Sequence, residues 1–204
     1  MRLIFALLLS VAAVAPTRAE PVPEDQRIAV DFRRTTLVVR DIDQSLPLYR
    51  DGIGMRVVYD QLIGGGTDAE GRAIPPTIRL VILRANDSFI GQLGLMQRLD
   101  AEPPPRRENR RALAGEAILV FNARDLDQRW AKIASLPHVT VSTAPERREY
   151  PAPGGGVIPV MFSAVWDADG NFIEINQILG APAGTTPAPA ATPQSDDTDK
   201  ESTP

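Results

Sequence analysis

Few side chains in this 204-residue sequence are able to do covalent or metal chemistry, because it contains no cysteine and one histidine, His138. The absence of cysteine excludes disulfides, iron–sulfur clusters, thiolate metal sites and thiol nucleophiles. One histidine leaves almost no material for a Ser-His-Asp triad or a two-histidine metal site within the chain. His138 follows Leu136 and Pro137 at an expected helix-to-strand turn, and we interpret it as an exposed loop residue rather than a ligand.

Three other features could serve a ligand, and each has a simpler structural interpretation. The arginine cluster Arg106–Arg111 could attract an anion, but beside three consecutive prolines it is typical of a solvated linker. Gly64–Gly66 and Gly154–Gly156 could let loops close over a ligand, but neither run sits at the strand-to-helix turn that a phosphate cradle requires. Tyr150 and Trp166 could stack on a flat ligand, although aromatic residues at strand ends usually pack against neighbours.

The net charge of −4 lies in the ends of the chain rather than in its middle. Residues 27–180 hold nineteen arginines and lysines and nineteen aspartates and glutamates, so this stretch is neutral. A neutral domain lacks the positive surface with which proteins bind phosphates of nucleic acids, and we expect no nucleic-acid partner. Apolar residues make up 43% of the chain and charged residues 24%, which is typical of a globular domain.

Both ends of the chain predict segments outside the folded domain. Arg2 precedes an apolar run from Leu3 to Ala15, and Thr17-Arg18-Ala19 supplies the small residues of a cleavage site. We interpret residues 1–19 as a secretory signal peptide, because a membrane anchor needs about 20 apolar residues. The protein is then expected in the periplasm or outside the cell, without a membrane span after cleavage. Residues 20–32 form an N-terminal segment, and residues 180–204, rich in Pro, Ala and Thr, are predicted to be a disordered acidic tail.

A five-residue motif that occurs twice organises the middle of the chain. Residues 40–44 read RDIDQ and residues 124–128 read RDLDQ, 84 residues apart. Each motif follows an apolar, β-branched run, at 35–39 and 117–121, which predicts a strand. Each precedes apolar residues at helical spacing, and its aspartates are placed to cap that helix: Asp41 or Asp43 in the first copy, Asp125 or Asp127 in the second.

Further strand-like segments complete each half of the chain. They cover 55–59, 78–84 and 89–96 in the first half, and 139–143, 158–165 and 172–178 in the second. Asn86-Asp87 and Asp167–Asn171 are typical turn residues between the last two strands. The order β-α-β-β-β therefore occurs twice, in modules at about 33–98 and 115–179. We predict a single α+β domain in which the two modules pair with pseudo-twofold symmetry.

Two segments of the chain resemble the vicinal oxygen chelate superfamily, which includes glyoxalase I, bleomycin-resistance proteins and ring-cleaving dioxygenases. The first is TTLVVRDIDQSLPLYRDGIGMRVV at Thr35–Val58, in which Ser45 and Tyr49 follow the first motif at the family's spacing. The second is DADGNFIEI at Asp167–Ile175, which is similar to the closing strand of the family. The resemblance covers about residues 33–179 and implies paired β-α-β-β-β modules that form a cupped mixed sheet.

The resemblance also implies four inward-facing metal positions, one on the first and one on the last strand of each module. The last-strand position of the second module corresponds to Glu174. Its counterpart in the first module is Gln92 if the turns are aligned, or Gly94 if the apolar residues are aligned. The two first-strand positions, seven residues before each helix-opening aspartate, correspond to Arg34 and Ile118, where the family has histidine. Arginine repels a cation and isoleucine has no lone pair, so the departures disfavour a metal.

The same residues allow a metal site and a metal-free site. Glu116, two residues from Ile118, could join Glu174 and Gln92 if the register slips, and this set would suit Mg²⁺ or Ca²⁺. Without a metal, Arg34 could clamp a ligand carboxylate or phosphate, and Glu174 could act as a base. Arg34 and Glu174 could equally form a buried ion pair that only fixes the register.

We therefore favour a small-molecule binding protein, comparable in kind to the bleomycin-resistance proteins, with a cavity between its modules and no catalytic metal. Arg34, Gln92, Glu116 and Glu174 are its candidate ligand-binding residues, and Glu174 is the candidate catalytic residue if the protein is an enzyme. The alternative is a lyase or dioxygenase of the glyoxalase kind with a non-standard divalent metal. A structural envelope protein that retains the fold is a third possibility. The sequence leaves open the ligand and whether the modules pair within one chain or across a homodimer.

Overall fold

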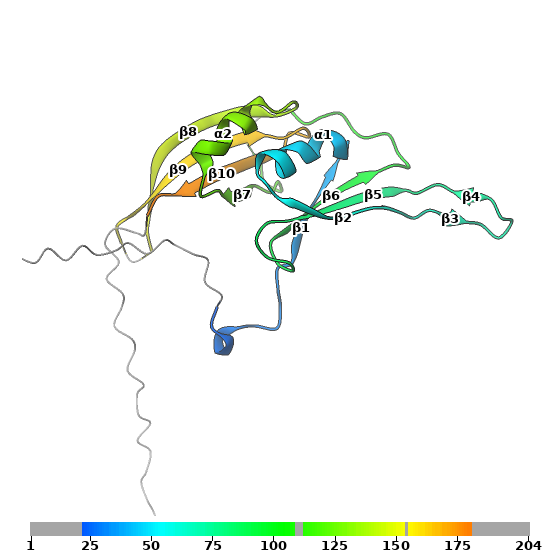
Figure 1. Ribbon diagram of the computed structural model, residues 1–204, viewed down its shortest axis with the longest axis horizontal. Coiled ribbons are helices and arrows are strands. Elements are labelled where there is room, and N and C mark those ends of the chain that lie inside the picture. Colours follow the sequence, from blue (N-terminus) through cyan, green and yellow to red (C-terminus); the bar gives the residue numbers. More distant parts are fainter. Residues whose placement is uncertain (1–21, 109–111, 154, 181–204) are drawn as a thin grey trace, which may run out of the picture.

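The computed structural model describes residues 22–108, 112–153 and 155–180. The predicted signal peptide and the predicted tail beyond Gly180 lie outside these residues. The described chain forms two four-stranded mixed sheets, and the helical segments of the two modules lie next to each other (Figure 1). A short 3₁₀-helix, η1 (Glu24–Gln26), precedes the first sheet.

The first module has the predicted order, with one inserted hairpin. Its elements are β1 (Arg34–Val39), α1 (Ile42–Pro47), the π-helical turn η2 (Leu48–Gly52), β2 (Arg56–Ile63), β3 (Gly66–Thr67), β4 (Ala73–Ile74), β5 (Ile78–Arg84) and β6 (Gln92–Arg98). The β3–β4 hairpin extends away from the rest of the molecule in Figure 1.

The second module repeats the order without the hairpin. Its elements are β7 (Leu119–Asn122), α2 (Leu126–Ser135), β8 (Thr140–Pro151), β9 (Val157–Trp166) and β10 (Phe172–Ile178). The strand order is β1-β6-β5-β2 in one sheet and β7-β10-β9-β8 in the other, so every strand of these two sheets has a counterpart at the same place. In each sheet the first and last strands of the module run parallel and the other pairs antiparallel. The predicted α+β fold of two β-α-β-β-β modules is confirmed.

One face of each sheet packs on the helices and forms a core that both modules share. Side chains alternate across a strand, so residues two apart point the same way. Leu93 and Leu95 on β6, and Ile173 and Ile175 on β10, are almost fully buried in one cluster with residues from both helical segments. Gly94 and Glu174 lie between them and therefore belong to the opposite face of their sheets. Because a single cluster spans both modules, we describe the two modules as one domain.

The two helices begin differently, although the motifs before them are nearly identical. The Asp41 carboxylate accepts the backbone N–H groups of Asp43, at 2.8 Å, and Gln44, at 3.4 Å, and so caps α1 as predicted. Within the described residues, no side-chain hydrogen bond caps the start of α2, because the Asp125 carboxylate binds Arg129 instead, whose Nε donates to it at 2.7 Å. The prediction that an aspartate of the second motif caps α2 is wrong for this reason.

Among the described residues, the structure contains no helix with the length and apolar character that a membrane span requires.

Candidate functional site

A turn of the second module holds a buried carboxylate that is fully satisfied by hydrogen bonds. Asp167, at the start of the turn between β9 and β10, has no solvent exposure. It accepts hydrogen bonds from the backbone N–H groups of Asp169 and Asn171, at 2.9 and 2.7 Å, and from the Asn171 side chain at 2.8 Å. It also accepts one from the Tyr49 hydroxyl of the first module, at 2.8 Å. The carboxylate therefore shapes its own turn and reaches the other module.

The next aspartate of this turn binds the first module directly. The Asp169 carboxylate accepts the backbone N–H of Arg40 at 2.9 Å, its Nε at 3.1 Å and the Ser45 hydroxyl at 2.8 Å. Arg40 Nη2 also donates to the Ala168 carbonyl at 3.0 Å. The Asp169 side chain is 7% exposed, and that of Arg40 is 30% exposed. We call this contact, formed by Arg40, Ser45, Tyr49, Asp167 and Asp169, the closed junction.

Arg106, in the segment that links the modules, also binds the turn between β9 and β10. Its Nε donates to the Ala168 carbonyl and its Nη2 to the Asp167 carbonyl, each at 2.9 Å. The interpretation of the arginine cluster as a solvated linker is therefore wrong for Arg106, which is partly buried. Residues 109–111 of the cluster lie outside the described chain.

The buried Tyr49 hydroxyl of the closed junction makes the free energy of unfolding depend on pH in the alkaline range. Burial, and then the negative charge of Asp167, raise the pKa of the Tyr49 hydroxyl well above its usual value of 10. The folded protein therefore keeps this proton at pH values where the unfolded chain has lost it. The stabilisation is complete below pH 10 and decreases above it, by about 1.4 kcal/mol per pH unit.

We expect Tyr49→Phe to remove this alkaline decrease. Urea unfolding of both proteins at pH 8 and pH 11 measures it, and the wild type should lose more stability over this interval than the variant. The comparison at each pH cancels the titration of other groups. Equal losses in the two proteins would show that the Tyr49 hydroxyl does not titrate as its burial requires.

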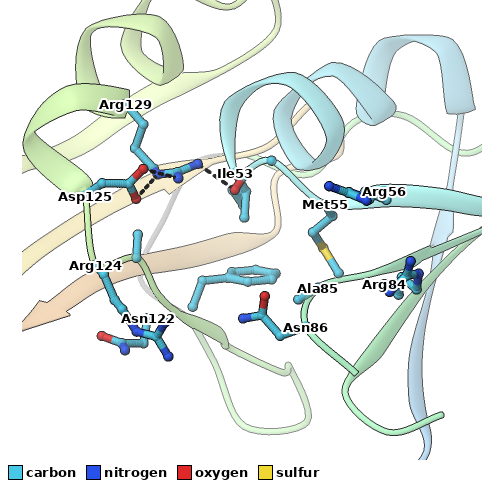
Figure 2. Close-up of a pocket in the computed structure, with 13 residues that line it drawn as sticks. Ile53, Met55, Arg56, Arg84, Ala85, Asn86, Asn122, Arg124, Asp125 and Arg129 are labelled. Atoms are coloured by element: carbon cyan, nitrogen blue, oxygen red, sulfur yellow. Dashed lines mark hydrogen bonds and ion pairs between the residues drawn. The ribbon is translucent and has the colours of Figure 1, made fainter. Parts of the chain in front are cut away.

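A pocket of about 750 Å³ lies at the pseudosymmetric counterpart of the closed junction. The first module contributes the segment before β2 and the turn after β5, and the second contributes the end of β7 and the start of α2. The Arg129 guanidinium bridges the two modules at one wall, since Nη1 donates to the Ile53 carbonyl at 2.7 Å while Nε binds Asp125 (Figure 2). The lining residues are Ile53, Gly54, Met55, Arg56, Arg84, Ala85, Asn86, Phe121, Asn122, Ala123, Arg124, Asp125 and Arg129. We call it the open junction.

The sequence did not point to the open junction. Among the polar residues of the open junction, Arg124 could have been noticed from the sequence, because it occupies the same place as Arg40 in the repeated motif, 84 residues later. Arg56 and Arg84 lie outside the repeated motif and become neighbours through strand pairing.

The predicted site residues Arg34 and Gln92 come together on adjacent strands. They are register partners between β1 and β6. Gln92 is 8% exposed, and its Nε2 donates to the Ser88 carbonyl at 2.8 Å, whereas its Oε1 is buried without a hydrogen-bond partner in the described structure. The Arg34 side chain forms no hydrogen bond or ion pair with any described residue. Neither side chain lines the open junction.

Strand register settles which residue of the first module corresponds to Glu174. Glu174 pairs with Val120 on β7, and the repeat relates Val120 to Thr36 on β1. Thr36 pairs with Gly94, so Gly94 rather than Gln92 is the counterpart. A Cβ at Gly94 would lie 2.7 Å from Thr36 Oγ1, which leaves no room for a carboxylate side chain unless Thr36 moves. The first module therefore has no ligand at this position.

The two glutamates are placed apart from Arg34. The Glu174 carboxylate accepts a hydrogen bond from Asn176 Nδ2 at 3.2 Å, and no ion pair joins it to Arg34 within the described ranges. Glu116 precedes β7, accepts the backbone N–H of Leu113 at 2.9 Å and lies 3.6 Å from Arg107 Nη1. The first observation disagrees with the Arg34–Glu174 ion pair that was one alternative from the sequence. The second disagrees with a position of Glu116 on the strand.

These donors do not fit the metal site that the fold family implies. At the four equivalent positions stand Arg34, Ile118, Gly94 and Glu174, which together offer one carboxylate and one repelling cation. Ile118 lies before the start of β7 and is 45% exposed. Among the described residues, no group of three or more His, Asp or Glu side chains is arranged to hold a metal ion.

The remaining candidates have structural roles or lie on the surface. His138 is exposed and adopts a left-handed backbone conformation, with φ of 63°, at the turn before β8. Trp166 packs on Phe172 with ring centres 4.8 Å apart, whereas Tyr150 is exposed on β8. Gly64 takes a φ of 86° at the end of β2, where the chain enters the β3–β4 hairpin. Gly154 lies outside the described residues.

Comparison with solved structures establishes the fold. A glyoxalase family protein from Bacillus cereus superposes with a TM-score of 0.52 at 13% sequence identity, covering 78% of this chain and 100% of that one. An antibiotic-binding protein from Streptomyces sp. CB03234 gives a TM-score of 0.46 at 18% identity, covering 74% and 99%. The trypanothione-dependent glyoxalase I of Leishmania major gives 0.44 at 17% identity, covering 73% and 87%. No known family profile matches the sequence, and no curated protein matches it.

Proposed function

We propose that the protein is an exported binding protein of glyoxalase-like fold that holds a small molecule at the open junction and works without the family's metal. The observation that carries this proposal is the pocket itself. Its volume of about 750 Å³ lies within the range of small-molecule sites, roughly 300–1,000 Å³. It is lined by both modules, and ligand sites are frequent at such interfaces. Export follows from the signal peptide proposed at residues 1–19.

The alternative is a lyase or dioxygenase with a non-standard metal. It would rest on Glu174, the one carboxylate at the four family positions. Since Thr36 occupies the space next to Gly94, the first module would have to rearrange before it could supply a second ligand at that position. The residues present favour binding over this alternative.

Native mass spectrometry of the protein exported by its producing cell tests the proposal. We expect a chain that begins at Glu20, carries no stoichiometric divalent ion and shows the mass of a co-purified small molecule or an added one. The same spectrum gives the oligomeric state and so tests whether the protein is a homodimer. A divalent ion bound at one equivalent per chain would overturn the metal-free function.

Two variants then locate the small molecule. Ala85→Trp fills the open junction and should abolish binding of a molecule detected in the wild type. Ala144→Trp adds the same bulk at an exposed position of β8 outside the pocket and should leave binding unchanged. Loss of binding in both variants, or in neither, would contradict the proposed site.

A further inference from the structure

The internal repeat supplies a comparison between two equivalent arginines. Arg40 and Arg124 occupy the same position of the repeated motif, after β1 and β7 respectively. The Arg40 guanidinium binds the Asp169 carboxylate in the closed junction, with a distance of 3.1 Å between Arg40 Nε and Asp169 Oδ1. Arg124 lines the open junction and has no hydrogen bond or ion pair to any residue of the described chain. The open junction therefore has an arginine that corresponds to Arg40, but no carboxylate that corresponds to Asp169 is paired with it among the described residues.

The turn that corresponds to Asp167–Asn171 does not supply the missing carboxylate. In the first module this turn contains Asp87, whose carboxylate accepts the backbone N–H groups of Phe89 and Ile90 at 2.7 and 2.9 Å. Asp87 thus closes its own turn and does not line the pocket. Asp125 does line the pocket, but it is already neutralised by Arg129.

Two more arginines without partners face each other at the same pocket. Arg56 on β2 and Arg84 on β5 are direct cross-strand neighbours, and both line the open junction. Like charges placed directly opposite each other destabilise a sheet. Neither side chain forms an ion pair or hydrogen bond within the described residues. Arginines nearby in the first module do have carboxylate partners: Arg50 pairs with Asp51, and Arg79 with Asp60.

We propose that the open junction binds the oxyanion group of a small organic molecule, a carboxylate or a phosphate, through Arg56, Arg84 and Arg124. This inference rests on the proposed function and specifies the ligand class. Guanidinium groups bind carboxylate and phosphate through two parallel hydrogen bonds, and three of them without counter-charges suit a ligand with more than one anionic oxygen.

The arrangement of the side chains agrees with such a ligand. Arg56 and Arg84 lie on one side of the pocket and Arg124 with Asn122 on the other, with Asn86 between them (Figure 2). The two asparagine amides add neutral hydrogen-bonding groups. Met55 and Phe121 add apolar surface for the body of an organic ligand.

Isothermal titration of the exported full-length protein with citrate and with inorganic phosphate tests the inference, with sodium chloride at equal ionic strength as the control. We expect saturable binding of citrate, of phosphate or of both, and the pattern identifies which oxyanion the pocket prefers. Arg124→Gln and Arg84→Gln should each weaken that binding about tenfold or more, because each removes a charge-assisted contact. Arg147→Gln, on exposed β8 and paired with Glu149, removes the same charge elsewhere and should have no effect.

A second measurement separates loss of the site from loss of the fold. Arg124→Gln removes no described contact and should leave the thermal midpoint of the ligand-free protein unchanged. Arg40→Gln breaks the closed junction and should lower it. If neither oxyanion binds, or if Arg124→Gln and Arg147→Gln bind equally well, the anion inference fails. The proposed function survives that result if a neutral molecule still binds and Ala85→Trp blocks it, whereas it fails too if no small molecule binds at all.

Discussion

Asp169→Ala is expected to lower the free energy of unfolding by about 3 kcal/mol. The substitution removes the acceptor for Arg40 and Ser45 and leaves a partly buried guanidinium without its counter-charge. Breaking such a pair by removing one partner costs more than the pair contributes, since the desolvation penalty of the remaining charge is no longer offset. Urea unfolding monitored by circular dichroism measures the change.

Two comparisons test whether this loss belongs to the junction between the modules. Asp87→Ala alters the equivalent turn of the first module, where the carboxylate is exposed and holds two backbone N–H groups, and should cost much less. A double-mutant cycle of Asp169→Ala with Arg40→Ala should give a clear coupling energy, because the two side chains are in direct contact. Additive effects would show that Asp169 acts within its own turn rather than across the junction.

Ile133→Ala is expected to destabilise the protein by about 3 kcal/mol, because it opens a cavity where the modules meet. Ile133 on α2 has no solvent exposure and is the repeat counterpart of Tyr49. It packs against η2 of the first module so closely that a Cβ on Gly52 would lie 3.1 Å from its Cγ1. Thermal and urea unfolding should show one transition shifted as a whole, since both modules share one core.

Graded substitutions check the size of the Ile133 effect. Ile133→Val removes one methylene group and should cost about 1 kcal/mol. Val120→Ala, at a side chain that is 62% exposed, should change stability by less than either. Two separate unfolding transitions in Ile133→Ala, one for each module, would contradict the description of the molecule as a single domain.

The repeated motif made most of the fold predictable. The spans 78–84 and 172–178 coincide with β5 and β10, because apolar residues buried on one face mark these strands clearly. Strand β8 extends eight residues beyond the predicted 139–143, to Pro151. It lies at the edge of its sheet and is mostly exposed, so its charged segment Glu146–Glu149 shows no alternation of apolar and polar residues. The β3–β4 hairpin was missed because two-residue strands have no periodicity to read.

The site was much less predictable, because it depends on where the copies of the repeat differ. RDIDQ and RDLDQ are almost the same sequence, yet Asp41 caps a helix whereas Asp125 pairs with Arg129. Nothing in the sequence shows that Asp169 reaches Arg40 while Asp87 stays in its own turn. The Asp169–Arg40 contact joins residues 129 positions apart in the sequence, and it is set by how the modules dock.

The unlike junctions also bear on how a protein of this design can diverge. If two identical single-module subunits formed the molecule, symmetry would place the same residues at both junctions, and each substitution would occur twice. Joining the modules in one chain removes that constraint. One junction can then keep the Arg40–Asp169 contact that holds the molecule together, while the other is free to accumulate residues such as Arg56, Arg84 and Arg124 that repel each other. In a chain that carries both modules, the residues that hold the modules together and the residues proposed to bind a ligand can therefore change independently.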